Sequence, residues 1–136
     1  MTLTDTGPLV ALLHRRDPQH VRCVELADQI APGPLLTTWP CLTEAMHLLH
    51  RVDGSRGQDL LWELVAKEMV QLTDLTWTNM FRMQELMERY RNVPMDLADA
   101  SLVAVAESRG IRQLFSLDSD FRIYRLADGT SLELIP

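Results

Sequence analysis

The chain has 136 residues, of which 46% are hydrophobic and 24% charged, with a formal net charge of −6. This length suits one domain with one sizeable core, so we expect a single domain over residues 1–136. Apolar runs such as residues 102–106 are too short to span a membrane. The N-terminus carries Asp5 at once and lacks the basic and apolar regions of a secretory signal. We therefore expect a cytoplasmic protein.

Neither the cysteines nor the net charge identifies a ligand. Cys23 and Cys41 are too few and too far apart for a disulfide framework or a zinc site, and we expect buried thiols. A negative net charge disfavours a nucleic-acid partner. However, 12 of the 13 basic residues are arginine, with Lys67 the exception, and arginine suits phosphate oxygens. Acids bound to a metal ion would also be neutralised locally, so net charge does not decide the partner.

Short strands alternate with helices along the chain. In chain order we predict a strand over 2–5, helices over 7–14 and 17–30, a strand over 35–38, helices over 39–50 and 56–67, a strand over 69–72, helices over 77–90 and 96–109, a strand over 113–117, a turn or short helix over 118–124, and an edge strand over 132–135. This alternation implies a parallel sheet covered on both faces. In such sheets ligands bind outside the carboxyl ends of the strands.

The boundaries of these elements are set by residues that break helices and strands. Pro32-Gly33-Pro34 and Asp53-Gly54 predict turns, Pro94 interrupts the chain, and Gly110 ends the long apolar helix. The last helix before Pro94 also carries Met80, Met83 and Met87 at helical spacing. We interpret this methionine stripe as core packing rather than as a binding surface.

Four acids are predicted at one edge of the sheet. Asp5 follows the first strand, Glu44 lies early in the helix after the second strand, Asp99 lies in the first turn of the apolar helix, and Asp118 follows the fourth strand. Converging carboxylates repel one another and raise each other's pKa unless a cation intervenes. Because carboxylate oxygens without His or Cys partners suit Mg²⁺ or Mn²⁺, the pattern favours a metal site.

Each acid also has an ordinary structural interpretation. Asp5 could cap the following helix, and capping is the favoured role for Asp96, with Asp99 stabilised near the same positive helix end. Asp118 could simply form a turn. Glu44 has mostly apolar neighbours, which predicts a partly buried carboxylate, bound to metal or paired with an arginine. Individually these indications are weak, but their convergence on one sheet edge favours a site.

Four segments of the chain resemble a known family. Residues 5–13 (DTGPLVALL) are similar to the opening of a PIN domain, and residues 37–49 are similar to its second motif around a glutamate. Residues 95–107 (MDLADASLVAVAE) and 115–121 (FSLDSDF) are similar to the third and fourth motifs of bacterial VapC-type toxins. The resemblance extends from about residue 3 to residue 125, and the two C-terminal motifs, in order and correctly spaced, are its most specific part.

The resemblance implies a three-layer α/β/α fold with a mostly parallel sheet of about five strands, and a ribonuclease dependent on Mg²⁺ or Mn²⁺. It assigns the catalytic and metal-binding roles to Asp5, Glu44, Asp99 and Asp118. Auxiliary roles near the site would belong to Thr6, Asp96, Ser116 and Asp120. The family often has threonine at the position of Ser116, whose hydroxyl can still bind a metal ligand or a water. No acidic position of the family pattern is missing.

The resemblance also implies partners. These would be an RNA substrate, a cognate antitoxin protein and a second copy of the chain in a homodimer. Arginines close in sequence to the acids could hold RNA phosphates, although solvated surface charge is an equally good interpretation of each one. These arginines are Arg15, Arg16, Arg122 and Arg125.

Three other functions compete with hydrolysis of RNA by a metal-activated water. A phosphoacceptor receiver domain needs a lysine near its acids, and Lys67 is predicted at the opposite end of the sheet. A haloacid-dehalogenase-type phosphatase needs a second Asp two residues after its nucleophile, where this chain has Gly7. A PIN-like module that binds RNA or protein without catalysis stays open, because intact acids do not prove turnover.

Overall fold

The computed structural model describes residues 1–30 and 32–136, in which short strands alternate with helices. The strands are β1 (Thr2–Thr4), β2 (Leu35–Thr38), β3 (Val70–Thr73), β4 (Gln113–Phe115) and β5 (Glu133–Ile135). The helices are α1 (Thr6–Leu13), α2 (His20–Gln29), α3 (Trp39–Ala66), α4 (Trp77–Arg89), α5 (Leu97–Arg109) and the short 3-10 helix η1 (Ser119–Arg122). Each predicted strand and helix has a counterpart here.

The five strands form one sheet in the order β3-β2-β1-β4-β5, and every neighbouring pair is parallel. The central strand β1 pairs on both sides, with Leu3 opposite Leu36 of β2 and Leu114 of β4. The last strand, β5, lies at one edge of the sheet. The prediction of a parallel, five-stranded sheet with a C-terminal edge strand is therefore confirmed.

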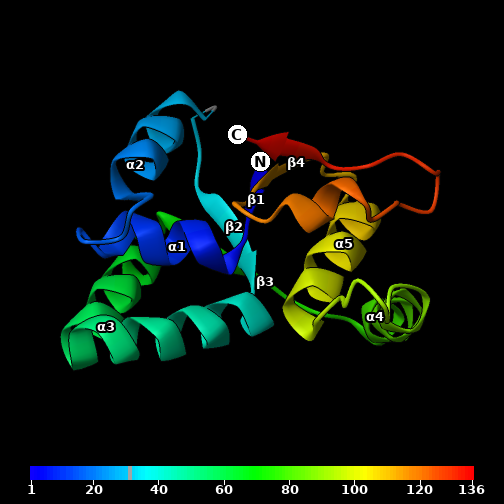
Figure 1. Ribbon diagram of the computed structural model, residues 1–136, viewed down its shortest axis with the longest axis horizontal. Coiled ribbons are helices and arrows are strands. Elements are labelled where there is room, and N and C mark those ends of the chain that lie inside the picture. Colours follow the sequence, from blue (N-terminus) through cyan, green and yellow to red (C-terminus); the bar gives the residue numbers. More distant parts are fainter. Residues whose placement is uncertain (31) are drawn as a thin grey trace.

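Helices cover both faces of this sheet, which gives three layers (Figure 1). Successive strand residues face opposite layers because side chains alternate along a strand. Leu36 and Leu114 pack in the cluster that contains α5 and α4. Their neighbours Leu35 and Phe115 pack on the other side, against residues of α1, α2 and α3. The three-layer α/β/α fold expected from the sequence is thus confirmed.

The largest differences from the predicted element boundaries lie at two places. Helix α2 begins at His20 rather than at residue 17, because Asp17 accepts a hydrogen bond from the backbone N–H of Gln19 (2.8 Å) and forms a turn there. The two helices predicted around Asp53-Gly54 form one continuous span, α3, with a sharp kink. Gly54 makes that kink with φ 61° and ψ −151°, a conformation that favours glycine.

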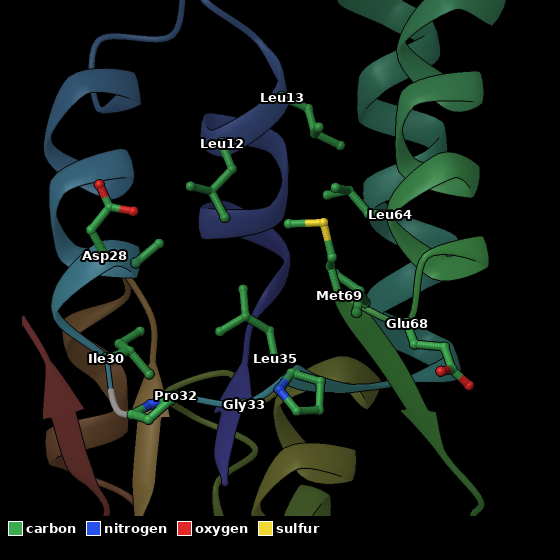
Figure 2. Close-up of a pocket in the computed structure, with 13 residues that line it drawn as sticks. Leu12, Leu13, Asp28, Ile30, Pro32, Gly33, Leu35, Leu64, Glu68 and Met69 are labelled. Atoms are coloured by element: carbon green, nitrogen blue, oxygen red, sulfur yellow. The ribbon is translucent and has the colours of Figure 1, made fainter.

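An apolar pocket of about 620 Å³ opens where β2 and β3 begin, at the end of the sheet opposite the predicted acids. Figure 2 shows the side chains of Leu12, Leu35 and Leu64 around this space. Its lining includes the carboxylate-bearing Asp28 and Glu68 but none of the four acids assigned to the metal site. The pocket therefore plays no part in the site described below.

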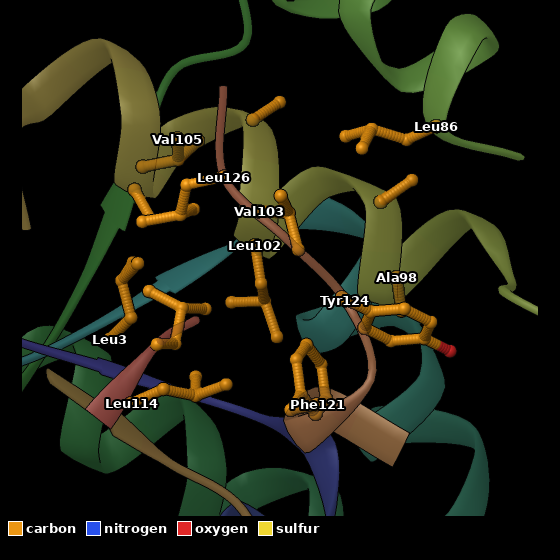
Figure 3. Close-up of a cluster of buried hydrophobic side chains, with 14 of the residues drawn as sticks. Leu3, Leu86, Ala98, Leu102, Val103, Val105, Leu114, Phe121, Tyr124 and Leu126 are labelled. Carbon is orange, nitrogen blue, oxygen red and sulfur yellow. The ribbon is translucent and has the colours of Figure 1, made fainter. Parts of the chain in front are cut away.

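The largest core cluster lies between the sheet and helices α4 and α5 (Figure 3). Met83 belongs to this core, as predicted for the methionine stripe, but Met80 is 40% exposed and lies beside a surface groove. Both cysteines are buried free thiols, as expected. In the part of the chain that the structure describes, no helix combines the length and apolar character needed to span a membrane.

Candidate metal centre

The sheet topology places the first and last acids on neighbouring strands. Asp5 directly follows β1, and Asp118 lies three residues after the end of β4, the strand next to β1. The strand order changes direction at this pair, since the chain runs from β1 outward to β2 and β3 and returns on the far side to β4 and β5. Such a switch point opens a crevice at the carboxyl ends of parallel strands.

Asp5 is held by hydrogen bonds from neutral donors. Its carboxylate is 8% exposed and accepts the backbone N–H of Thr6 (2.8 Å) and the hydroxyl of Ser116 (2.8 Å), one on each oxygen. Burial raises the pKa of Asp5 to about 6, although both hydrogen bonds lower it, and the charges of Glu44 and Asp118 raise it further. Asp5 is thus both the N-cap of α1 and a constrained acid at the carboxyl end of β1.

Asp99 lies in the first turn of α5, where Asp96 caps the helix by accepting the backbone N–H of Asp99 (2.8 Å). The capping role favoured for Asp96 is therefore present. Asp99 is 8% exposed, and its Oδ2 accepts a hydrogen bond from the hydroxyl of Tyr124 (3.1 Å). The pKa of Asp99 is raised to about 8, mainly by burial and further by the charges of Asp96, Asp5 and Asp118. The hydrogen bond from Tyr124 lowers this pKa.

Ser116 connects Asp5 with Asp118. Its hydroxyl donates to Asp5 and accepts the backbone N–H of Asp118 (3.0 Å). Asp118 is partly buried and accepts the backbone N–H of Asp120 (2.9 Å), which makes it the N-cap of η1. The turn-forming role considered for Asp118 is real, and it leaves the second carboxylate oxygen available to a ligand.

Glu44 differs from its prediction. The sequence indicated a partly buried carboxylate, but Glu44 is exposed, together with Thr43 and His47 on the same side of α3. The apolar neighbours that suggested burial, such as Leu42, occupy the opposite side of the helix. Glu44 still belongs to the cluster, because its Oε2 lies 3.3 Å from the hydroxyl of Thr6, the residue that follows Asp5.

Tyr124 was not among the candidate residues. It lies beyond the fourth motif, six residues after Asp118, and nothing in its sequence surroundings distinguishes it from a core tyrosine. Its hydroxyl reaches Asp99 because η1 turns the chain back over the first turn of α5. Only the tertiary structure reveals this contact.

In the part of the chain that the structure describes, the acids of the cluster have no basic partner. Within the described residues, salt bridges join Lys67 to Glu63, Arg82 to Glu85 and Glu107, and Arg112 to Asp128. None of these cations reaches the four acids. The donor set therefore consists of carboxyl and hydroxyl oxygens, and this is the chemistry that suits a hard divalent cation.

The carboxylates do not already surround one point. Across residues 1–30 and 32–136, no three His, Cys, Asp or Glu side chains are close enough together to form a metal-binding group. Mg²⁺ keeps several waters and is commonly held by one or two carboxylates, so a pre-formed three-carboxylate group is not a requirement. The residues present therefore fit such an ion.

Comparison with known proteins gives both a family and structural neighbours. The family model described as PIN domain matches residues 2–126. A toxin from Mycobacterium tuberculosis, VapC20, described as cleaving the sarcin-ricin loop, has a similar structure with a TM-score of 0.82 and 23% identity. The match covers 90% of this chain and 94% of that toxin. A search of curated proteins found no match.

Two further solved structures share the fold. A toxin–antitoxin complex from Klebsiella pneumoniae has a TM-score of 0.65 and 18% identity, covering 89% of this chain and 90% of that one. VapBC2 from Rickettsia felis, bound to a DNA fragment from its promoter, has a TM-score of 0.66 and 12% identity, covering 98% and 96%. The family match over residues 2–126 decides the assignment: this chain belongs to the PIN-domain family.

Proposed function

We propose that this protein is a ribonuclease that hydrolyses RNA phosphodiester bonds at a site holding Mg²⁺ or Mn²⁺ between Asp5, Glu44, Asp99 and Asp118. The observation that carries the proposal is the set of acids at the switch point of the sheet, where Ser116 links Asp5 with Asp118. Among the described residues, no salt bridge reaches any of the four acids. A cluster built only to stabilise the fold would normally pair its buried charges.

Each side chain has a distinct role in this proposal. Asp5, Asp99 and Asp118 would hold the cation, which when bound supplies an activated water and offsets the charge of the phosphodiester. The exposed carboxylate of Glu44 is free to bind the cation or to orient the attacking water and accept its proton at Oε1 or Oε2. Thr6 and Ser116 keep their neighbouring carboxylates in place through hydrogen bonds.

The residues around the four acids have different roles. Asp96 keeps its capping bond to α5, and Asp120 donates its N–H to Asp118. Arg125 directs its Nη1 to the backbone carbonyl oxygens of residues 122–124, at 2.6 to 3.2 Å, so it mainly stabilises its own turn. The exposed Arg122 is the better candidate for holding an RNA phosphate near Asp118.

The structural neighbours support a place in a toxin–antitoxin pair. One of them is a toxin that cleaves the sarcin-ricin loop, and another is a toxin–antitoxin complex. By analogy we propose that an antitoxin protein suppresses this chain and that the chain acts as a homodimer. A groove of about 690 Å³ along α4, with Met80, Met83 and Met87 in its lining, could receive a partner's apolar helix.

Cleavage of cellular RNA tests the proposal directly. Partner-free protein is incubated with total RNA and Mg²⁺ or Mn²⁺, with EDTA, and as the variant Asp99→Asn. The matched control is Asp59→Asn, which removes the same charge from an exposed position on α3. We expect cleavage that requires metal, survives Asp59→Asn, and falls on the order of 10²–10³-fold in Asp99→Asn, as when other charge-stabilising groups are removed.

Two results would contradict the proposal. Cleavage that is unchanged in Asp99→Asn would show that the activity does not come from this site. RNA binding that survives loss of the acids, with no cleavage at any metal concentration, would favour a PIN-like binding module without catalysis.

A further inference from the structure

We propose that Tyr124 is a positioning residue that orients Asp99 for metal binding. The inference rests on the proposed function, because Asp99 is assigned there as a ligand of the cation. It adds a residue that lies outside the four acids and outside the motifs that contain them.

The contact between the two side chains joins distant parts of the chain. Tyr124 follows η1, Asp99 lies 25 residues earlier in α5, and the phenolic hydroxyl donates to Asp99 Oδ2 at 3.1 Å. Tyr124 is 2% exposed, so water does not compete for this hydrogen bond from the tyrosine side. The bond therefore holds Oδ2 of Asp99 toward the core.

The tyrosine ring is itself held rigidly. It packs edge-on against Phe121 (centroids 5.3 Å apart, planes at 87°) and against Tyr90 (5.1 Å, 62°). Figure 3 shows the ring at the border of the core cluster, beside Ala98 and Phe121, with its hydroxyl directed out of the cluster. A hydroxyl on such a ring has little freedom to follow Asp99, so Asp99 must adapt to it.

The bond leaves the rest of the carboxylate available. In the part of the chain that the structure describes, hydrogen bonds reach both oxygens of Asp5 but only Oδ2 of Asp99. Under the proposed function, Oδ1 of Asp99 is thus the oxygen left to bind the cation. A neutral phenol orients the carboxylate without replacing the cation, whereas an arginine in its place would neutralise the charge that binds metal. Partners of this kind orient ligands in metal sites generally.

Tyr90 provides a matched control. It belongs to the same pair of packed rings, but its hydroxyl accepts the backbone N–H of Arg125 (2.9 Å) and touches none of the four acids. Tyr90→Phe and Tyr124→Phe therefore each remove one hydroxyl and one hydrogen bond from the same aromatic cluster. They differ in whether that bond ends on Asp99.

The experiment measures Mn²⁺ binding to the metal-free protein by titration calorimetry, together with RNA cleavage over a range of Mn²⁺ concentrations. We expect Tyr124→Phe to weaken Mn²⁺ binding about 10- to 100-fold, the usual cost of losing such a partner. Its cleavage should recover toward the wild-type rate at saturating Mn²⁺, with KM for RNA unchanged. Tyr90→Phe should bind Mn²⁺ like the wild type.

Equal Mn²⁺ affinities in the two variants and the wild type would overturn the role of Tyr124. If the wild type then still needs metal for cleavage and Asp99→Asn is inactive, the proposed function stands alone. If the wild type binds Mn²⁺ but cleaves no RNA, the proposed function is wrong. The Mn²⁺ affinities of the two variants still decide the role of Tyr124. A wild type that binds no Mn²⁺ overturns both proposals.

A second pair of variants serves if Tyr124→Phe does not fold. Tyr124→Gln keeps a hydrogen-bond donor and Tyr124→Leu does not, so we expect the Gln variant to bind Mn²⁺ more tightly than the Leu variant.

Discussion

At the level of single residues, structural roles and proposed metal-binding roles coincide in this protein. Asp5 caps α1, Asp96 caps α5, and Asp118 caps η1. An N-cap carboxylate uses one oxygen for a backbone N–H and keeps lone pairs for another ligand. Capping therefore does not argue against metal binding by Asp5 or Asp118. It holds the carboxylate at a defined place where a strand has just ended.

Burial and the neighbouring acids make a charged Asp99 unfavourable, so we expect Asp99→Asn to stabilise the metal-free protein. The variant keeps an oxygen that accepts from Tyr124 but removes the burden of a buried acid beside Asp5, Asp96 and Asp118. We expect thermal unfolding in EDTA to shift upward by a few degrees, as sites that store unfavourable interactions for function are commonly relieved by substitution. Asp59→Asn should leave the midpoint unchanged. A lower midpoint in Asp99→Asn would mean that the carboxylate is favourable to the fold.

At the scale of elements, α3 shows how one residue reshapes a helix. The span is helical on both sides of Gly54, and the kink turns its second part so that Leu61 reaches the core cluster of α1 and β3. The two parts of α3 pack closely at Gly57, because a Cβ built there would lie 3.0 Å from the carbonyl oxygen of Leu49. The predicted turn is thus realised inside a single helical span.

Gly54→Ala tests this conformation. A Cβ at residue 54 would meet no atom within 4 Å, so the cost comes from the backbone alone. Residues forced into a region reserved for glycine lose about 1–3 kcal/mol. We expect urea unfolding to show a loss of that size, with RNA cleavage per folded molecule unchanged because the kink is remote from the acids. Ser55→Ala, at the exposed next position, is the control. A loss as small as that of Ser55→Ala would contradict the strained geometry.

At the scale of the whole molecule, the candidate site is a product of topology. Its acids follow the ends of β1 and β4 and lie in the second turn of α3 and the first turn of α5. The four acids are separated from one another by 19 residues or more in the sequence, and the parallel sheet brings them to one edge. A cation bound there would connect both halves of the chain.

Metal binding should therefore stabilise the entire fold. With Mn²⁺ at 100 times its Kd, a ligand that binds only the folded state contributes about 2.7 kcal/mol. We expect the thermal midpoint to rise with Mn²⁺ concentration in the wild type and in Asp59→Asn, and not in Asp99→Asn. The measurement is thermal unfolding over a Mn²⁺ series. The same rise in Asp99→Asn would place the ion at another site.

The alternation of strands and helices, the parallel sheet and the position of Asp5, Asp99 and Asp118 at one edge of that sheet could be predicted from the sequence. These follow from local periodicity and from residues that end elements, such as Gly110, because both depend on neighbours in the chain. The same local information located the kink at Gly54. It also supported the family resemblance, since the acids recur at fixed distances from their strands.

Only the tertiary structure decided how the side chains face one another. Glu44 was expected to be partly buried because its sequence neighbours are apolar, but burial depends on which side of α3 meets the sheet. Met80 is exposed beside a buried Met83 for the same reason. Arg125 bonds to its own turn, and Tyr124 reaches Asp99, through contacts that no spacing encodes. Periodicity specifies a helix or strand, whereas the packing of distant elements specifies which atoms meet at the acids.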